Sequence, residues 1–97
     1  MLTHLQVNFP KTEISFYRTS NGAELDFIIK NNNKIIAVEC KTNISPVLSK
    51  GNRQSIKDIN PIKTVVIAPV KDTWSFDKNI TVAPLNDAIK IINDMIG

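Results

Sequence analysis

Hydrophobic and polar residues alternate along the first half of the chain, a pattern typical of β-strands. The β-branched and aromatic run that starts at Ile14 ends at a Ser-Asn-Gly turn signal, which predicts a first strand over 14–19. Two more runs of this kind, 24–30 and 34–42, are separated only by asparagines. They predict a β-hairpin.

A helical apolar stripe follows the hairpin, where strict alternation is lost. Ile56 and Ile59 lie one turn apart and predict a short helix over 49–60, which ends near an Asn-Pro pair. Either Ser45 or Ser49 is suited to be its N-cap, because a serine oxygen accepts hydrogen bonds from the free N–H groups of a first helical turn.

The last third of the chain holds the most apolar run and the most regular helical pattern. The run over 63–69 predicts a central strand covered on both faces. We expect a loop or short lid over 70–79, then a last strand at 80–83. An apolar period of three and four predicts a helix over 85–96, with Gly97 at its C-cap. The predicted order is β-β-β-α-β-β-α, an α/β fold.

Composition and charge narrow the class of protein. The 97 residues fit one domain, 1–97, because single cores usually occupy about 100 to 200 residues. With 42% hydrophobic and 22% charged residues, neither a disordered chain nor a coiled coil is expected. The net charge of +3 tolerates contact with phosphates but does not by itself indicate nucleic-acid binding.

No segment predicts a membrane span or a secretory signal, since the apolar runs are far shorter than the roughly 18 residues a span requires. Cys40 is the only cysteine, which excludes an intramolecular disulfide and a cysteine-rich zinc site. We therefore expect a soluble cytoplasmic protein, with the Cys40 thiol on the core side of its strand and not acting as a nucleophile.

Each strand of the predicted hairpin has one charged and one apolar face. The charged faces carry Glu24 and Asp26 in one strand and Glu39 and Lys41 in the other. A two-residue turn at 32–33 sets a register in which the apolar faces of both strands lie on the same side of the hairpin. This register places Asp26 opposite Glu39 and Glu24 opposite Lys41. The apolar face of the first strand carries Leu25, Phe27 and Ile29. The sequence thus predicts a cluster of four charged side chains.

Asp26 and Glu39 would then lie roughly 5 Å apart, a like-charge pair that destabilises a sheet unless a cation lies between them. Mg²⁺ or Mn²⁺ would remove the conflict, since such ions prefer carboxylate oxygens. A bound metal can generate a hydroxide nucleophile, and Lys41 is placed to orient that water or stabilise the phosphorus centre. This hypothesis makes Asp26 and Glu39 metal ligands, with Lys41 and Glu24 as further catalytic residues.

A structural interpretation of the same residues competes with this one. Glu24 would pair with Lys41, and Asp26 with Lys30 or Lys34, on a solvated sheet face where ion pairs contribute little. A D…ExK pattern occurs often by chance, so its strand context decides between the two interpretations.

Three segments carry a family resemblance: Tyr17–Thr19 (Tyr-Arg-Thr), Gly22–Ile28 (Gly-Ala-Glu-Leu-Asp-Phe-Ile) and Ala37–Thr42 (Ala-Val-Glu-Cys-Lys-Thr). They closely resemble the C-terminal uncharacterised domain of a family of prokaryotic AAA-type ATPases, over about residues 14–85. That domain is similar to the PD-(D/E)xK nuclease superfamily. The resemblance implies a restriction-endonuclease-like mixed β-sheet flanked by helices and an Mg²⁺-dependent phosphodiesterase ancestry.

The resemblance places Asp26, Glu39 and Lys41 at the acidic and lysine positions of that superfamily, and it implies an AAA-type ATPase module as a partner in cis or in trans. Two features depart from it. Residues 1–7, which we expect to be the tail of a helix or a frayed arm, lack the acidic residue usual before the first strand, and Glu24 is the candidate substitute. The chain also lacks a Gly-x-x-x-x-Gly-Lys-Ser/Thr loop, so we expect no ATP hydrolysis by it.

Lys50, Arg53 and Lys57 recur at spacings of three and four on one face of the predicted helix over 49–60. They are candidate contacts to a DNA backbone, although a solvated helix face is the commoner explanation. Two hypotheses follow. One is an Mg²⁺-dependent nuclease or nuclease-like nucleic-acid-binding domain; the alternative is a non-catalytic interaction or regulatory C-terminal domain of an AAA-type ATPase.

Overall fold

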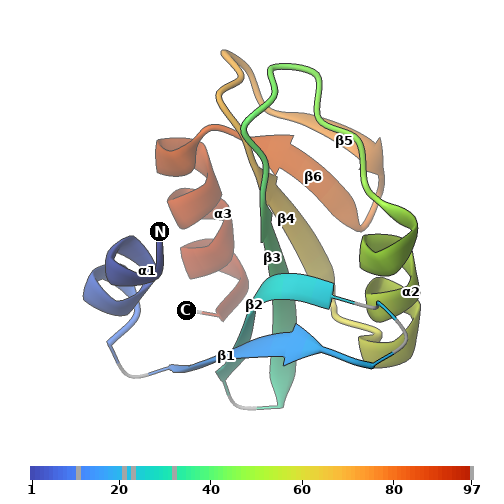
Figure 1. Cartoon of the computed structure of the whole chain (residues 1–97). Coiled ribbons are helices and arrows are strands. Elements are labelled where there is room, and N and C mark those ends of the chain that lie inside the picture. Colours follow the sequence, from blue (N-terminus) through green and yellow to red (C-terminus); the bar gives the residue numbers. More distant parts are fainter. Residues whose placement is uncertain (11, 21, 23, 32, 97) are drawn as a thin grey trace.

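The computed structural model describes residues 1–10, 12–20, 22, 24–31 and 33–96. Within these residues, six strands form one sheet in the order β1-β2-β3-β4-β6-β5 (Figure 1). The elements are α1 (Leu2–Asn8), β1 (Glu13–Arg18), β2 (Glu24–Asn31), β3 (Lys34–Cys40), α2 (Lys50–Ile59), β4 (Lys63–Ile67), β5 (Trp74–Asp77), β6 (Ile80–Ala83) and α3 (Leu85–Ile96). The β3-β4-β6 pairings are parallel and the other pairings antiparallel. The predicted fold class, a mixed sheet flanked by helices, is confirmed.

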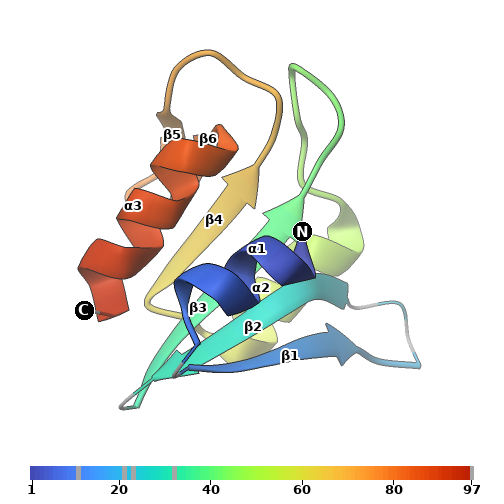
Figure 2. The ribbon, with the colours of Figure 1, turned by 90° about the vertical axis from the view of Figure 1, so that its left-hand side faces the viewer.

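Helices cover both faces of the sheet. Helices α1 and α3 lie on one face and α2 on the other, and Figure 2 shows α1 and α3 on the near side with α2 behind the strands. The core between the sheet and α1/α3 includes the fully buried Leu5, Ile29 and Ile92. Smaller clusters lie on the α2 face, around Val66 and around Ile28. None of the helices in the described part of the chain is long and apolar enough to span a membrane.

The N-terminal segment is a seven-residue helix, α1, and not a frayed arm. Leu5 is fully buried and Phe9, just after the helix, is 4% exposed, both in the α1/α3 core. So short a helix is unstable alone, and tertiary packing of its apolar side stabilises it. The short sequence window could not reveal that packing.

The segment 70–79, predicted as a loop or lid, contains strand β5. Trp74 lies opposite Val82 and Ser75 opposite Thr81 of β6, so the prediction of a loop is wrong for these residues. All four residues of β5 are exposed. Trp74 and Phe76 do alternate with polar residues, but a run of four residues is too short for alternation to distinguish a strand from a loop.

The remaining elements agree with the prediction to within two residues at their ends. Ser49, one of the two candidates, is the N-cap of α2. Asn31 pairs with Lys34 as predicted, and Asn33 has the positive φ of 70° that a tight turn needs. Residue 32 of this turn and the predicted C-cap Gly97 lie outside the described residues.

Candidate functional site

The ladder between β2 and β3 has the predicted register, with Ile28 opposite Ala37. It ends at Phe27, one step before the predicted pair of Asp26 and Glu39. The strands part here because β3 continues with β4 alone: the Lys41 N–H donates to the Ile67 carbonyl at 2.9 Å. The predicted pair of Glu24 and Lys41 is therefore not formed either.

Strand β2 contains a β-bulge at the same point. Its register with β1 shifts between Ser15 and Tyr17, so that Asp26 and Phe27 together face one residue of β1. Because β2 has one extra residue at the bulge, the side chains on its N-terminal side point to the faces opposite to those that regular alternation would give. Leu25 consequently packs in the cluster on the α2 face, and the prediction that it shares a face with Phe27 is wrong.

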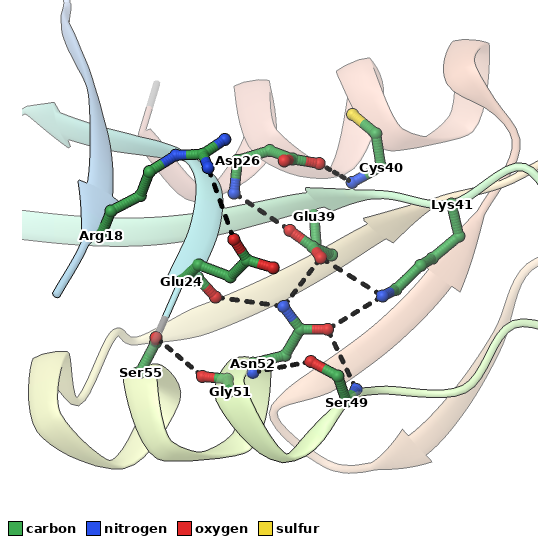
Figure 3. Close-up of polar contacts among 10 residues, drawn as sticks. All are labelled: Arg18, Glu24, Asp26, Glu39, Cys40, Lys41, Ser49, Gly51, Asn52 and Ser55. Atoms are coloured by element: carbon green, nitrogen blue, oxygen red, sulfur yellow. Dashed lines mark hydrogen bonds and ion pairs between the residues drawn. The ribbon is translucent and has the colours of Figure 1, made fainter. Parts of the chain in front are cut away.

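Carboxylates take the place of carbonyl groups where the ladder stops (Figure 3). The Asp26 N–H donates to Glu39 Oε1 at 3.0 Å, and the Cys40 N–H donates to Asp26 Oδ2 at 2.8 Å. Each acidic side chain thus accepts a hydrogen bond from the backbone of the opposing strand. These N–H donors offset part of the repulsion between the two carboxylates.

Glu39 is the buried centre of the cluster, with 6% of its surface exposed. Its Oε2 accepts a hydrogen bond from Asn52 Nδ2 at 2.7 Å and lies 3.3 Å from Lys41 Nζ. Burial raises the pKa of Glu39 above its ordinary value, and the negative charge of Asp26 raises this pKa further. The bonds from Asp26, Asn52 and Lys41 oppose the shift without cancelling it.

Asn52 joins this cluster to helix α2, and the sequence analysis did not identify it. Its Nδ2 donates to Glu39 Oε2 and to the Glu24 carbonyl, while its Oδ1 accepts from Lys41 Nζ and from the Ser49 N–H. These four bonds use the full capacity of an asparagine amide. Asn52 is also the third helical residue of α2 and completes the capping box begun by Ser49, at a position where glutamate or glutamine is the familiar signal.

The remaining charged residues are arranged differently from both interpretations of the sequence. The Glu24 carboxylate lies 3.6 Å from Arg18, and both side chains are more than half exposed, so only its backbone carbonyl joins the cluster. Lys41 pairs with Glu39 and not with Glu24. Lys34 donates to the Met95 carbonyl instead of pairing with Asp26. The face that holds Glu39 is covered by α2 and is not solvated.

The three basic residues Lys50, Arg53 and Lys57 lie on the exposed side of α2. The opposite side of the helix contributes the buried Asn52 and Ser55. The three residues therefore share an exposed face of the helix whose inner side closes the carboxylate cluster, and their contact with nucleic acid stays a prediction.

The Cys40 thiol packs against the α1/α3 core, as predicted. Burial raises its pKa to about 11, with Asp26 and Glu39 adding to the shift. At neutral pH the thiol is protonated and is a poor nucleophile.

Among the residues described by the structure, no group of three or more His, Cys, Asp or Glu side chains is arranged to hold a metal ion. Asp26 and Glu39 supply two carboxylates, but both oxygens of Glu39 already face nitrogen donors, including the Lys41 ammonium group. Mg²⁺ requires oxygen ligands in a near-octahedral arrangement. In this conformation the pair does not fit that ion.

Comparisons with known proteins place the fold among relatives. The family model described as "Domain of unknown function (DUF4143)" matches residues 1–88. None of the curated proteins compared with the chain matches it. A solved structure with a similar fold is the refined half-complex from a tetradecameric assembly of Thermococcus gammatolerans McrB AAA+ hexamers with bound McrC, at a TM-score of 0.54 and 12% identity. The similarity covers 95% of this chain and 30% of that chain.

Proposed function

The chain belongs to the DUF4143 family, and on that premise we propose that it is a non-catalytic interaction domain that acts with an AAA-type ATPase module, in cis or in trans. Two observations support the partner. The Tyr-Arg-Thr, Gly-x-Glu and Glu-x-Lys segments resemble a domain that follows such a module in sequence. The fold is similar to part of a complex that contains McrB AAA+ hexamers.

One observation supports the non-catalytic part of the proposal: the Glu39 carboxylate is buried and both of its oxygens are occupied. A hydrolytic site needs carboxylates that are open to a metal and to substrate. Glu39 is instead buried, with both oxygens facing nitrogen donors, and Lys41 is held between Glu39 and Asn52. We infer that these residues hold the ends of β2 and β3 against α2.

Co-purification tests the proposal. The chain is mixed with an AAA-type ATPase module from the same genome, and the complex is measured by light scattering and by the rate of ATP hydrolysis. We expect a stable complex that Asp26→Asn leaves intact, because this change keeps the shape of the carboxylate and the acceptor for the Cys40 N–H. Failure to bind any such module, with the chain folded, would contradict the proposal.

A nuclease remains the second candidate, because Asp26, Glu39 and Lys41 do converge, on the side of α2 opposite its basic residues. It requires Glu39 to exchange the donors Asn52 and Lys41 for Mg²⁺ or Mn²⁺. Calorimetric titration with either metal tests this directly. Metal binding that is lost in Asp26→Ala, together with DNA cleavage that is lost in Lys41→Ala, supports the nuclease and removes the first proposal.

The basic residues of α2 give that candidate a separate measurement. If Lys50, Arg53 and Lys57 contact a DNA backbone, neutralising all three should weaken DNA binding and reduce its dependence on salt concentration. Lys90, an exposed lysine of α3 on the opposite side of the sheet, provides the matched control.

A further inference from the structure

The segment that joins β3 to α2 presents aliphatic side chains to solvent. Ile44 and Val47 are 77% and 70% exposed. Their neighbours Pro46 and Leu48 are buried, and Leu48 belongs to an apolar cluster on the α2 face. Residues 42–49 contain no charged side chain. An exposed apolar segment that lacks charge and is anchored by buried neighbours has the composition of the centre of an interaction surface.

A hollow of about 410 Å³ adjoins this segment, and Ile44 forms part of its lining. The loop after β4 and the start of β5 supply the rest, namely Pro69, Val70, Lys71, Asp72 and Trp74. Most of these side chains are apolar, and the two charged ones have opposite signs. The hollow is therefore suited to receive apolar side chains of a partner.

Helix α2 continues the surface with positive charge. Lys50 follows Val47 by three residues, and Lys50, Arg53 and Lys57 extend along the exposed side of the helix over about 10 Å. None of these three forms an ion pair with any residue that the structure describes. The carboxylate of Asp58, on the same helix, accepts a hydrogen bond from Gln54 at 2.8 Å instead. The row of positive charge is thus left without an acidic partner in the described part of this chain.

We propose that the surface formed by Ile44, Val47, Lys50, Arg53 and Lys57 binds an acidic segment of the AAA-type ATPase module. Apolar side chains of that segment enter the hollow, and its carboxylates face α2. This inference rests on the proposed function and adds the side of the domain that contacts the module. Burial of apolar side chains supplies affinity, and the opposite charges select the partner and its orientation.

The composition of this surface argues against two other occupants. In a two-fold dimer the same patch lies on both copies, so the basic side of α2 would face like charge. A nucleic acid would neutralise the basic row through its phosphates, but it would leave the exposed aliphatic side chains of Ile44 and Val47 unused. An acidic protein segment matches both the charged and the apolar part of the surface.

Calorimetry of the full chain with an AAA-type ATPase module from the same genome tests the proposal. Wild-type binding should weaken as the salt concentration rises. The double variant Lys50→Glu/Arg53→Glu should bind at least about tenfold more weakly and lose this dependence on salt, because attraction becomes repulsion. Val47→Asn should also weaken binding but keep the salt dependence, because it removes apolar contact and no charge.

Matched controls lie on the other face of the sheet. Lys90 of α3 is an exposed lysine and Val7 of α1 is 71% exposed, so Lys90→Glu and Val7→Asn should bind the module as the wild type does. Circular dichroism checks that each variant is folded. Hydrogen exchange should slow at residues 44–57 in the complex.

The outcomes separate this inference from the proposed function. If the module binds the wild type and all variants equally, the surface is wrong and the proposed function stands. If the module does not bind the wild type, the proposed function fails and this inference fails with it. A double variant that loses affinity for duplex DNA but binds the module normally assigns the surface to nucleic acid, and self-association that Val47→Asn abolishes assigns it to a second copy; either result overturns the proposal.

Discussion

At the scale of the residue, Asn52 has the most demanding environment in the cluster. It is fully buried, and all four hydrogen-bonding positions of its amide are used by Glu24, Glu39, Lys41 and Ser49. An asparagine amide can donate two hydrogen bonds through its nitrogen and accept two through its oxygen, so it can serve a carboxylate and an ammonium group at once. We infer that it compensates the burial of both charges.

Replacing Asn52 with alanine should lower the free energy of unfolding by about 2 to 4 kcal/mol, because Glu39 and Lys41 each lose a buried partner. Urea denaturation measures the loss. Asn93→Ala, on the exposed side of α3, is the control and should change stability by less than about 0.5 kcal/mol. An Asn52→Ala variant as stable as this control would show that the network contributes nothing.

Glu39 should make stability depend on pH in an unusual direction for a carboxylate in an ion pair. Its pKa is raised in the folded protein above the ordinary value of 4.5, mainly by burial. The folded state then binds the proton more tightly than the unfolded state, so protonation of Glu39 stabilises the fold. This contribution grows as the pH falls through the folded-state pKa and is complete below 4.5.

The measurement compares the wild type with Glu39→Gln, which has no titrating group at this position. As the pH is lowered from neutral, the free energy of unfolding of the wild type should rise relative to that of the variant. Parallel curves for the two proteins would mean that Glu39 is not buried as a charge. A relative fall in the wild type would mean that its ion pair with Lys41 outweighs its burial.

At the scale of the element, helix α2 depends on a capping box that also belongs to the cluster. Ser49 Oγ accepts from the Asn52 N–H at 3.0 Å, and the Ser49 N–H donates back to the Asn52 side chain. Ser49→Ala should therefore cost about 1 kcal/mol of unfolding free energy, the usual value of a lost N-cap. Ser45→Ala, at the exposed serine that the sequence left as an alternative cap, should cost far less in the same denaturation experiment.

The elements show which features the sequence could predict. Helix α3 was predicted with both its ends, Leu85 and Ile96, because its apolar period is unbroken over three turns. The register of β2 with β3 followed from alternation and a short turn. The bulge at Asp26 could not be predicted, since it depends on how β1 packs beside β2 and leaves no mark in the alternation.

The candidate site also has features that the sequence could predict and features that it could not. Alternation brought Asp26, Glu39 and Lys41 to one place, and the structure does gather them. The burial and hydrogen bonding of Glu39 could not be predicted, because they depend on Asn52 of helix α2. No local sequence pattern specifies how this helix is rotated against the sheet. Asparagine at the third helical position was a faint signal of a capping box, and it gave no reason to expect contact with β3.

At the scale of the whole molecule, the two faces of the sheet are covered unequally. One face has α1 and α3, which share a continuous core, and the other has α2 with smaller apolar clusters. A 97-residue chain has about 5 to 15 kcal/mol of stability in total, so the loss of one layer would be decisive. The short helix α1 is the part of this cover for which the sequence left two alternatives, the tail of a helix or a frayed arm.

Phe9 tests whether α1 is an integral part of the core. It is 4% exposed, its N–H donates to the Leu5 carbonyl at 2.8 Å, and its ring lies in the α1/α3 core. Phe9→Ala should lower the free energy of unfolding by about 3 to 5 kcal/mol, as expected for a large buried ring. Val7→Ala is the control, because Val7 is 71% exposed on the same helix and its truncation should change stability by less than about 0.5 kcal/mol.

The shape of the unfolding transition of Phe9→Ala shows whether α1 unfolds together with the rest of the domain. If α1 folds as one unit with the sheet and α3, Phe9→Ala should shift a single cooperative transition, seen alike by circular dichroism and by the fluorescence of Trp74, which lies at the far edge of the sheet. If α1 is instead a docked arm, the variant should lose helical signal first while the fluorescence transition stays in place. Coincident transitions at lower denaturant concentration are expected, because Leu5 and Phe9 share their core with Ile92 of α3 and leave no separate apolar cluster that could persist without them.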